Sequence, residues 1–293
     1  LYFLTTKDLL MQQTENDKSA GLTTDDISDS HVLLNDKLHG PYLGSHLHHP
    51  FSKPMLSRGI SPEMLSLESI PPLNHYYQPS ADTSQAIIFS MATLAEYYDG
   101  NIGNHLCRIR DSMKLLCQQL QKHSHYQAIL TPANQLLIYH AALLHDIGKM
   151  RVPLDLNIKS GALSSEEFEI MAQHAVWGKD ALELAEHHCG LDSKLLSFAK
   201  EIAYSHHERW NGSGYPQGLK GNEIPVSARL MALADVYDGL ITPKSYKPAM
   251  SHTDTVEIIR ESRDNLFDPV VVDAFLETEC EFKMIAAHYP IIS

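Results

Sequence analysis

Adjacent histidine and aspartate residues, His145 and Asp146, follow an apolar run that ends at Leu144. Burying an unpaired charge at such a place is costly, and coordination of a metal ion removes that cost. Imidazole together with carboxylate suits manganese, iron, zinc and related ions. Taken alone the pair is weak evidence, because a polar side chain with an ordinary hydrogen-bond partner explains it equally well.

Further residues of metal-ligand type lie at or near the ends or apolar faces of predicted helices. They are His105, His174, the adjacent pair His206 and His207, and Asp235. Each of these alone also reads as a satisfied polar side chain. Counted with His145 and Asp146 they make five sites, a recurrence that favours a metal centre assembled from several helices.

Helix-like spacing of apolar residues fills the chain after residue 80. Residues 82–98 and 106–120 have this spacing, a Thr-Pro pair at 131–132 starts a third helix, and a capping box at 164–167 opens a fourth. Further helices are predicted at 179–188, 193–207, 225–240, 253–263 and 269–279. Residues 211–225, rich in Gly and Pro, predict a structured loop. No convincing alternating strand pattern occurs here, so we predict an all-α domain over residues 81–293.

Residues 1–80 differ in character from the rest of the chain. They contain Pro and Gly clusters and no sustained helical period, which predicts a small irregular N-terminal region. His46, His48 and His49 offer metal-ligand chemistry, but an exposed loop is the commoner explanation for such a cluster. For this region we expect an interaction role, as a sensor, a homodimer contact or a contact with a signalling-protein partner.

Composition excludes some classes of function. The formal net charge of -13 argues against a general DNA or RNA binder, although a bound metal can reverse the local sign for a small phosphate ligand. No apolar run approaches the roughly 20 residues that span a bilayer, so membrane insertion is not expected. The four cysteines lie far apart, which is typical of reduced thiols and predicts a cytoplasmic protein.

Five stretches in order along the chain resemble the HD-GYP domain family, bacterial phosphodiesterases of cyclic dinucleotides. They are residues 104–108, residues 144–149, His174, the loop with Gly214-Tyr215-Pro216 and Gly218-Leu219, and residues 234–238. The resemblance covers residues 85–290. It implies an HD-domain helical bundle with a C-terminal HD-GYP extension, and hydrolysis of cyclic di-GMP or 3'3'-cyclic GMP-AMP to linear dinucleotide or mononucleotides.

The same resemblance implies a two-metal centre. Asp146 would bridge two divalent ions, iron or manganese. His105, His145 and Asp235 would complete one ion, and His174, His206 and His207 the other. Two such ions can activate water for attack on a phosphodiester and stabilise the charge that develops on it. A third ion is doubtful, because Asn101 stands where some members have a glutamate.

Substrate contacts are also implied by the resemblance. Lys149 would act at the phosphate as a catalytic and binding residue, and Tyr215 would shape the substrate side of the site. Asp238, Lys244 and Lys247 are grouped with them as substrate-binding residues. Where the family has an arginine near position 244, this chain has lysine, a point charge in place of a bidentate fork.

Two other functions fit part of this pattern. A non-enzymatic receptor would bind the nucleotide without turnover, but degenerate members usually lose metal ligands and this chain has kept them. Another HD-type phosphohydrolase would act on linear nucleotides, and the Gly-Tyr-Pro loop with the second set of histidines argues against it. Turnover of cyclic and linear nucleotides by metal-loaded protein separates the three.

Overall fold

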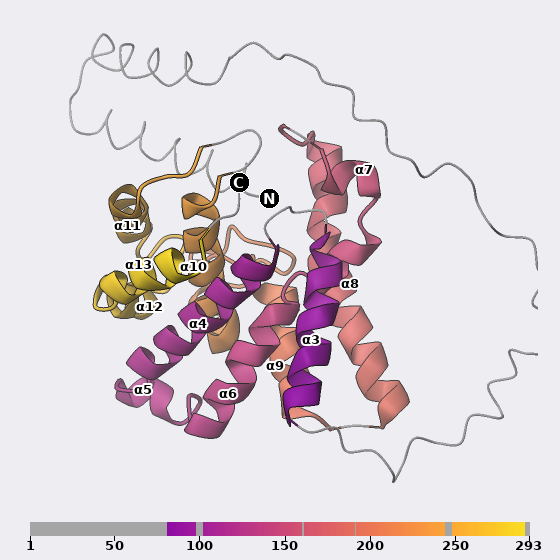
Figure 1. Ribbon diagram of the computed structural model, residues 1–293, viewed down its shortest axis with the longest axis horizontal. Helices are drawn as coiled ribbons and strands as arrows, with labels where there is room; N and C mark the ends of the chain where they lie inside the picture. Colours follow the sequence, from indigo (N-terminus) through magenta and orange to yellow (C-terminus); the bar gives the residue numbers. More distant parts are fainter. Residues whose placement is uncertain (1–80, 98–101, 160, 191, 244–247, 291–293) are drawn as a thin grey trace, which may run out of the picture. The chain divides into compact units, whose positions relative to one another are not determined.

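The computed structural model describes residues 81–97, 102–159, 161–190, 192–243 and 248–290 (Figure 1). The predicted N-terminal region, residues 1–80, lies outside these ranges, as do Asn101, Lys244 and Lys247. The predictions made for these residues, and the predicted domain boundary, therefore remain predictions.

The described residues form helices and no named strand, which confirms the predicted all-α class. The α-helices are α3 (Ala81–Ala95), α4 (Ile102–Leu120), α5 (Ser124–Gln127), α6 (Pro132–Ala141), α7 (Leu154–Asn157), α8 (Ser165–Cys189), α9 (Lys194–Ser205), α10 (Val226–Ile241), α11 (His252–Glu261), α12 (Pro269–Leu276) and α13 (Glu279–His288). Three short 3-10 helices are η4 (Ala142–Leu144), η5 (Ile147–Arg151) and η6 (Gly221–Glu223).

Helix starts follow the capping signals in the sequence. The Thr131 hydroxyl accepts a hydrogen bond from the Asn134 amide at the start of α6. Ser164 and Glu167 form the predicted capping box at the start of α8. Each side chain satisfies a backbone N–H that has no partner within its helix. These signals act over three or four residues, so the sequence alone predicts them.

α5, α7 and α13 were not predicted, and two predicted helices form a single one. The helices expected from 164 onward and at 179–188 are a single 25-residue helix, α8, which ends at Gly190 with a left-handed φ of 59°. Gly178, a residue of low helix propensity, lies inside this helix. Packing against η5 and α9 keeps the helix continuous.

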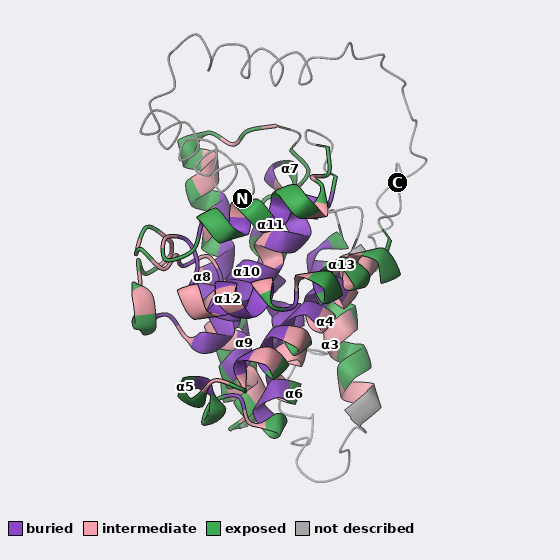
Figure 2. Ribbon diagram, turned by 90° about the vertical axis from the view of Figure 1, so that its left-hand side faces the viewer, coloured by how far each residue is buried: buried purple, intermediate pink, exposed green. Residues whose placement is uncertain are grey.

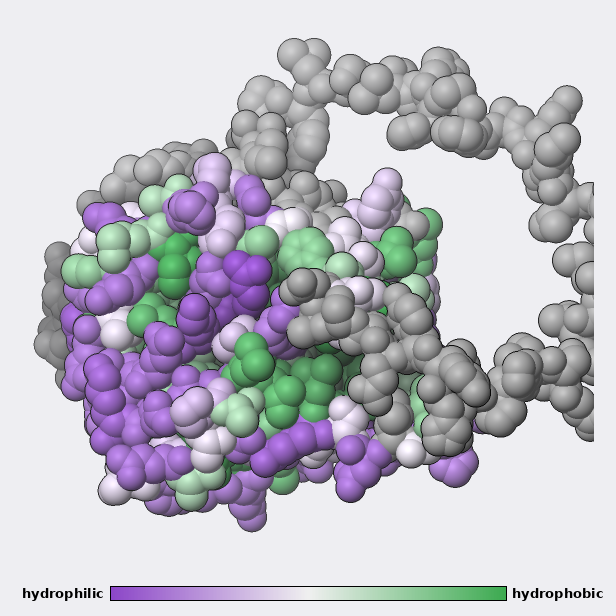
Figure 3. All heavy atoms as spheres, turned by 60° about the horizontal axis from the view of Figure 1, so that its bottom comes forward, coloured by the Kyte–Doolittle hydropathy of each residue, from purple (hydrophilic) through white to green (hydrophobic). Residues whose placement is uncertain are grey.

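The core lies between α4, α6, α9 and α10. α4 packs against α6 and α10, and α9 packs against α6, α8 and α10. From α4 the core takes Ile109, Met113, Leu116 and Leu120, all fully buried. Figure 2 shows the buried residues concentrated on the facing sides of these helices. The face in Figure 3 is largely hydrophilic, with hydrophobic side chains gathered near its middle. Among the described residues, no helix is long and apolar enough to cross a membrane.

A glycine sets the spacing between η5 and α8. A β-carbon at Gly148 would lie 2.0 Å from the carbonyl oxygen of His174 and 2.5 Å from the amide nitrogen of Gly178. Only glycine allows two backbones to approach so closely. This contact brings the turn that carries Asp146 and Lys149 against the part of α8 that carries His174.

We expect Gly148→Ala to lower the free energy of unfolding by about 3 kcal/mol, because the added methyl group overpacks a backbone contact that cannot yield. Urea denaturation followed by circular dichroism measures this change. Gly103→Ala is the matched control, since a β-carbon at this exposed α4 position meets nothing within 4 Å. Equal losses for the two variants would contradict the close-approach argument.

Candidate metal centre

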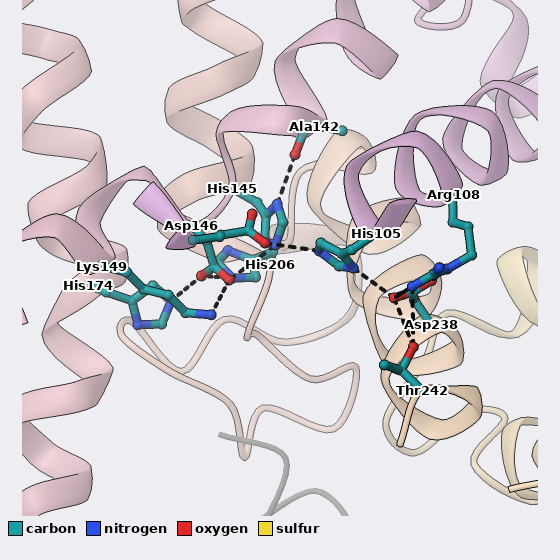
Figure 4. A network of polar contacts seen from close by, with 11 residues as sticks. His105, Arg108, Ala142, His145, Asp146, Lys149, His174, His206, Asp238 and Thr242 are labelled. Carbon is teal, nitrogen blue, oxygen red and sulfur yellow. Dashed lines mark hydrogen bonds and ion pairs between the residues drawn. The ribbon is translucent and has the colours of Figure 1, made fainter. Parts of the chain in front are cut away.

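Asp146 lies at the centre of the site, in the turn between η4 and η5 (Figure 4). Its carboxylate oxygens lie 3.2 Å from Nε2 of His145 and 3.2 Å from Nε2 of His174. Nζ of Lys149 lies 2.5 Å from Oδ2. Nε2 of His206 lies farther away, at 3.9 Å. Cationic or ligand-type atoms thus surround a buried carboxylate on more than one side.

Two groups of ligand-type residues flank this position. We call Glu96, His105 and His145 the first metal group. We call Asp146, His174, His206 and His207 the second metal group. Within each group one ligand atom per residue lies within 4.8 Å of all the others. The helices that bring them together are α3, α4, α8 and the end of α9, together with the turn after η4.

Most of the histidine rings are fixed from behind by backbone carbonyl oxygens. Nδ1 of His145 lies 2.9 Å from the Ala142 carbonyl oxygen. His174 and His206 make the same contact with the carbonyl oxygens of residues 171 and 202, at 2.7 and 2.9 Å. A proton on Nδ1 leaves Nε2 as the free lone pair, and this is how metal-binding histidines are usually oriented.

The site contains buried polar atoms with no hydrogen-bond partner in the described part of the chain. They are Oε1 of Glu96, Nε2 of His145, Oδ1 of Asp146, Nε2 of His206 and the hydroxyl of Tyr215. Buried polar atoms are nearly always partnered, and four of these five are metal-ligand types. The donor set therefore fits divalent metal ions.

The pKa values of the histidines differ between the two metal groups. Burial lowers the pKa of His174 to about 3 and that of His206 to about 4, and holds the pKa of His207 well below its usual range. These rings are neutral at pH 7 and ready to coordinate. Burial also lowers the pKa of His145, but the charges of Asp146 and Glu96 outweigh it and raise that pKa to about 10.

Asp235, on α10, belongs to neither group, although its charge acts on both. The half-buried carboxylate raises the pKa values of His145 and His206 against the effect of burial. The structure thus brings His174, His206 and His207 together with Asp146, and His105 together with His145. Asp235 lies close to this centre, and its role as a ligand remains a prediction.

Asp238 holds His105 from behind, in the way the carbonyl oxygens hold the other rings. One oxygen lies 2.7 Å from Nδ1 of His105, and Arg108 donates hydrogen bonds to both oxygens (Figure 4). Burial raises the pKa of Asp238, but His105 and Arg108 lower it to about 2. With both oxygens engaged in a buried position, Asp238 is suited to positioning His105, and its contact with substrate remains a prediction.

Tyr215 lies where the Gly-Tyr-Pro loop meets the second metal group. Its ring stacks on His207 with centroids 4.8 Å apart and meets Phe168 edge to face at 5.6 Å. The buried Glu208 carboxylate accepts hydrogen bonds from the Gln217 and Leu219 amides, which fixes the loop. The hydroxyl of Tyr215, buried and unpartnered, remains a candidate for contact with substrate.

Glu96 is the residue that the sequence did not single out. It stands just after α3 in a stretch where a glutamate reads as an ordinary surface residue. The structure instead buries it, with Oε2 3.4 Å from Nε2 of His105. The available signal was its place near the end of an amphipathic helix, and that signal does not tell a ligand from a solvated charge.

Comparison with known proteins agrees with this geometry. The profile of the HD domain family matches residues 90–271. The chain belongs to the HD domain family. It is 48% identical over 204 residues to a probable cyclic di-GMP phosphodiesterase of Vibrio cholerae, an alignment that covers 70% of this chain and 46% of the relative. A cyclic di-GMP phosphodiesterase of the same organism is 47% identical over 207 residues, covering 71% and 42%.

A 3'3'-cGAMP-specific phosphodiesterase of Vibrio cholerae is 34% identical over 209 residues, covering 71% of this chain and 37% of the relative. The chain thus spans less than half the length of each of these relatives. The relatives, with the HD domain match, confirm the predicted HD-GYP membership, and the HD domain implies binding of divalent metal.

We expect Asp238→Asn to weaken metal binding at the first metal group by about 10- to 100-fold, the usual effect of losing a carboxylate behind a metal-binding histidine. Calorimetric titration of metal-free protein with Mn(II) measures it. Asparagine keeps the shape, so the fold should persist, and the affinity of the second metal group serves as the internal control. Two unchanged affinities would contradict the positioning role.

Metal binding to the first metal group should weaken as the pH falls below the pKa of His145, about 10, and so already at neutrality. Since the folded pKa of His145 is about 10, this ring carries a proton at pH 7 that a metal ion must displace. For each proton that the metal ion displaces, the apparent affinity for the metal falls about tenfold for every unit by which the pH is lowered. The second group should show little such dependence near neutrality, because its histidines are already neutral. Titrations with Mn(II) at two pH values measure both slopes, and equal slopes would refute the assignment.

Proposed function

We propose that this chain is a metal-dependent phosphodiesterase that hydrolyses a 3',5'-cyclic dinucleotide, with cyclic di-GMP as the first candidate and 3'3'-cyclic GMP-AMP as the second. The observation that carries the proposal is the buried Asp146 carboxylate between two groups of histidines. The curated relatives add support, because their names describe phosphodiesterases of these two nucleotides.

The proposed centre holds two divalent ions, iron or manganese. Asp146 is their shared ligand. His105, His145 and Asp235 serve one ion, and His174, His206 and His207 serve the other. When bound, such ions supply Lewis-acid stabilisation of the charge that develops on the phosphate and activate the attacking water. Mixed imidazole and carboxylate ligation favours iron or manganese over zinc.

The remaining roles fall to side chains around this centre. Lys149 pairs with Asp146 at 2.5 Å and is partly exposed, so its ammonium group can turn toward a phosphate when metal ions engage the carboxylate. Tyr215 provides a hydroxyl beside His207 on the same side as the loop. Lys244 and Lys247 are proposed as further phosphate contacts on the sequence resemblance alone.

The setting of the enzyme is part of the proposal. We place it in the cytoplasm, where separated cysteines remain reduced. Residues 1–80 are proposed to make an interaction, either with a second copy of the chain or with a signalling protein. The net charge of -13 supports neither a DNA nor an RNA partner.

Mn(II)-loaded or anaerobic Fe(II)-loaded protein should hydrolyse cyclic di-GMP, and Asp146→Ala should reduce turnover by at least about 10³-fold, since it removes the ligand common to both ions. Chromatography of the products measures hydrolysis and shows whether it stops at the linear dinucleotide. Parallel reactions contain 3'3'-cyclic GMP-AMP and a panel of linear nucleotides.

Glu261→Gln is the matched control, because it removes an exposed carboxylate on α11. Metal content is measured for every variant. Tight cyclic dinucleotide binding without turnover by metal-replete protein would establish a receptor in place of an enzyme. Turnover confined to linear nucleotides would establish a different HD-type phosphohydrolase.

A further inference from the structure

One charged side chain links the end of α3 to the metal centre. Glu96 lies one residue beyond α3 and is only 4% exposed, whereas Leu94 and Tyr97 beside it are 61% and 64% exposed. An ionised carboxylate is costly to bury without partners. Its surroundings should therefore contain a group that compensates its charge.

The contacts within the described residues compensate Glu96 only in part. Oε2 lies 3.4 Å from Nε2 of His105, a distance that fits an ion pair. Oε1 is buried and has no hydrogen-bond partner, and the same holds for Nε2 of His145. An ion pair with His105 alone leaves both of these atoms unsatisfied.

A bound metal ion would satisfy all three residues together. The ligand atoms of Glu96, His105 and His145 lie within 4.8 Å of one another, and the two imidazole rings are 5.7 Å apart. Atoms bound about 2.0–2.2 Å from a common ion have separations in this range. Two imidazoles and one carboxylate also form a common ligand set for iron and related ions.

We propose that Glu96 is a ligand of the metal ion held by His105 and His145, and that this bond fastens α3 to the helical bundle. The proposal rests on the proposed metal centre and adds a ligand to it. Position 101 carries an amide, Asn101, and the carboxylate in this part of the chain is that of Glu96, five residues earlier.

Few buried side chains attach α3 to the rest of the helical bundle, so a bond from Glu96 to a metal ion would matter for the position of this helix. Among the side chains of α3 whose burial is described, Ala92 and Ala95 are buried. Ala92 packs with Leu106 and Leu143 in a small cluster, against which the partly buried Ile88 and Phe89 also pack. Ile87, Met91 and Leu94 are about half exposed or more. The two alanines bury little apolar area, and Ile88 and Phe89 are only partly buried, so these contacts hold the helix less firmly than a fully buried face would. A metal bond at its C-terminal end would add to this attachment.

The proposed bond would couple the packing of α3 on the helical bundle to the occupancy of the metal ion. If the ion binds more tightly when α3 is seated, then seating of α3 and occupancy of the ion favour each other by the same factor. α3 begins at Ala81, directly after residues 1–80 in the sequence, and Glu96 follows its last residue. A partner that displaces α3 would lower metal affinity, and the metal would oppose that partner equally.

The test compares the full chain, Glu96→Gln and Glu261→Gln, each stripped of metal and titrated with Mn(II) without oxygen. Plasma mass spectrometry after gel filtration gives the ions bound per chain. Glu96→Gln should lose one ion per chain, or bind it at least tenfold more weakly, while Glu261→Gln matches the wild type. Hydrogen exchange of peptides covering 85–97 is read in parallel. Mn(II) should slow it in the wild type and in Glu261→Gln but leave it unchanged in Glu96→Gln.

Peptides around His174 report the second metal group and should be protected by Mn(II) in all three proteins. Glu96→Asp keeps the charge and should retain the ion with reduced affinity, which keeps the test decisive if the glutamine variant folds poorly. An unchanged ion count in Glu96→Gln, with α3 still protected by metal, overturns the inference and leaves the centre intact. A wild type that binds no Mn(II) overturns the metal centre itself.

Discussion

The structure of this site depends on a negative charge held in a buried position. Asp146 is 6% exposed, and Lys149 and His145 stabilise its ionised form against burial, so that its pKa stays well below the ordinary value. A carboxylate in this state must stay surrounded, so the fold has to bring histidines from distant parts of the chain to it. The close contact of Gly148 with α8 accomplishes this for His174. A bound ion would complete the arrangement by occupying the atoms that remain unpaired.

A second layer of contacts fixes the ligands before any metal arrives. Backbone carbonyl oxygens hold three histidine rings, while the carboxylate of Asp238 holds His105. Asp238 in turn is bound by Arg108, which is fully buried and also donates to the carbonyl oxygen of Tyr289 at 3.0 Å. The orientation of one proposed ligand thus depends on packing between α4, α10 and the end of α13. Buried networks of this kind work only when every member is satisfied.

The membership of the HD domain family and the geometry lead to the same class of chemistry by separate routes. The family match rests on sequence over residues 90–271, and the geometry rests on distances between side chains. The net charge of -13 does not favour an anionic ligand, and bound divalent ions would reverse the sign of the charge locally at the centre. The end of α3 adds a further element, because Glu96 lies 3.4 Å from Nε2 of His105 at that centre.

The sequence by itself determined the features of the fold that depend on interactions within a few residues. It predicted the all-α class, the capping box at Ser164, and the candidate ligands near helix ends, because periodicity and capping are local. It predicted two helices where the structure has the single helix α8, because the packing against η5 and α9 is not visible in the sequence. The burial of Glu96 and the engagement of Asp238 by Arg108 were decided by tertiary structure alone. Both depend on residues brought together from α3, α4 and α10, and no local pattern in the sequence encodes such contacts.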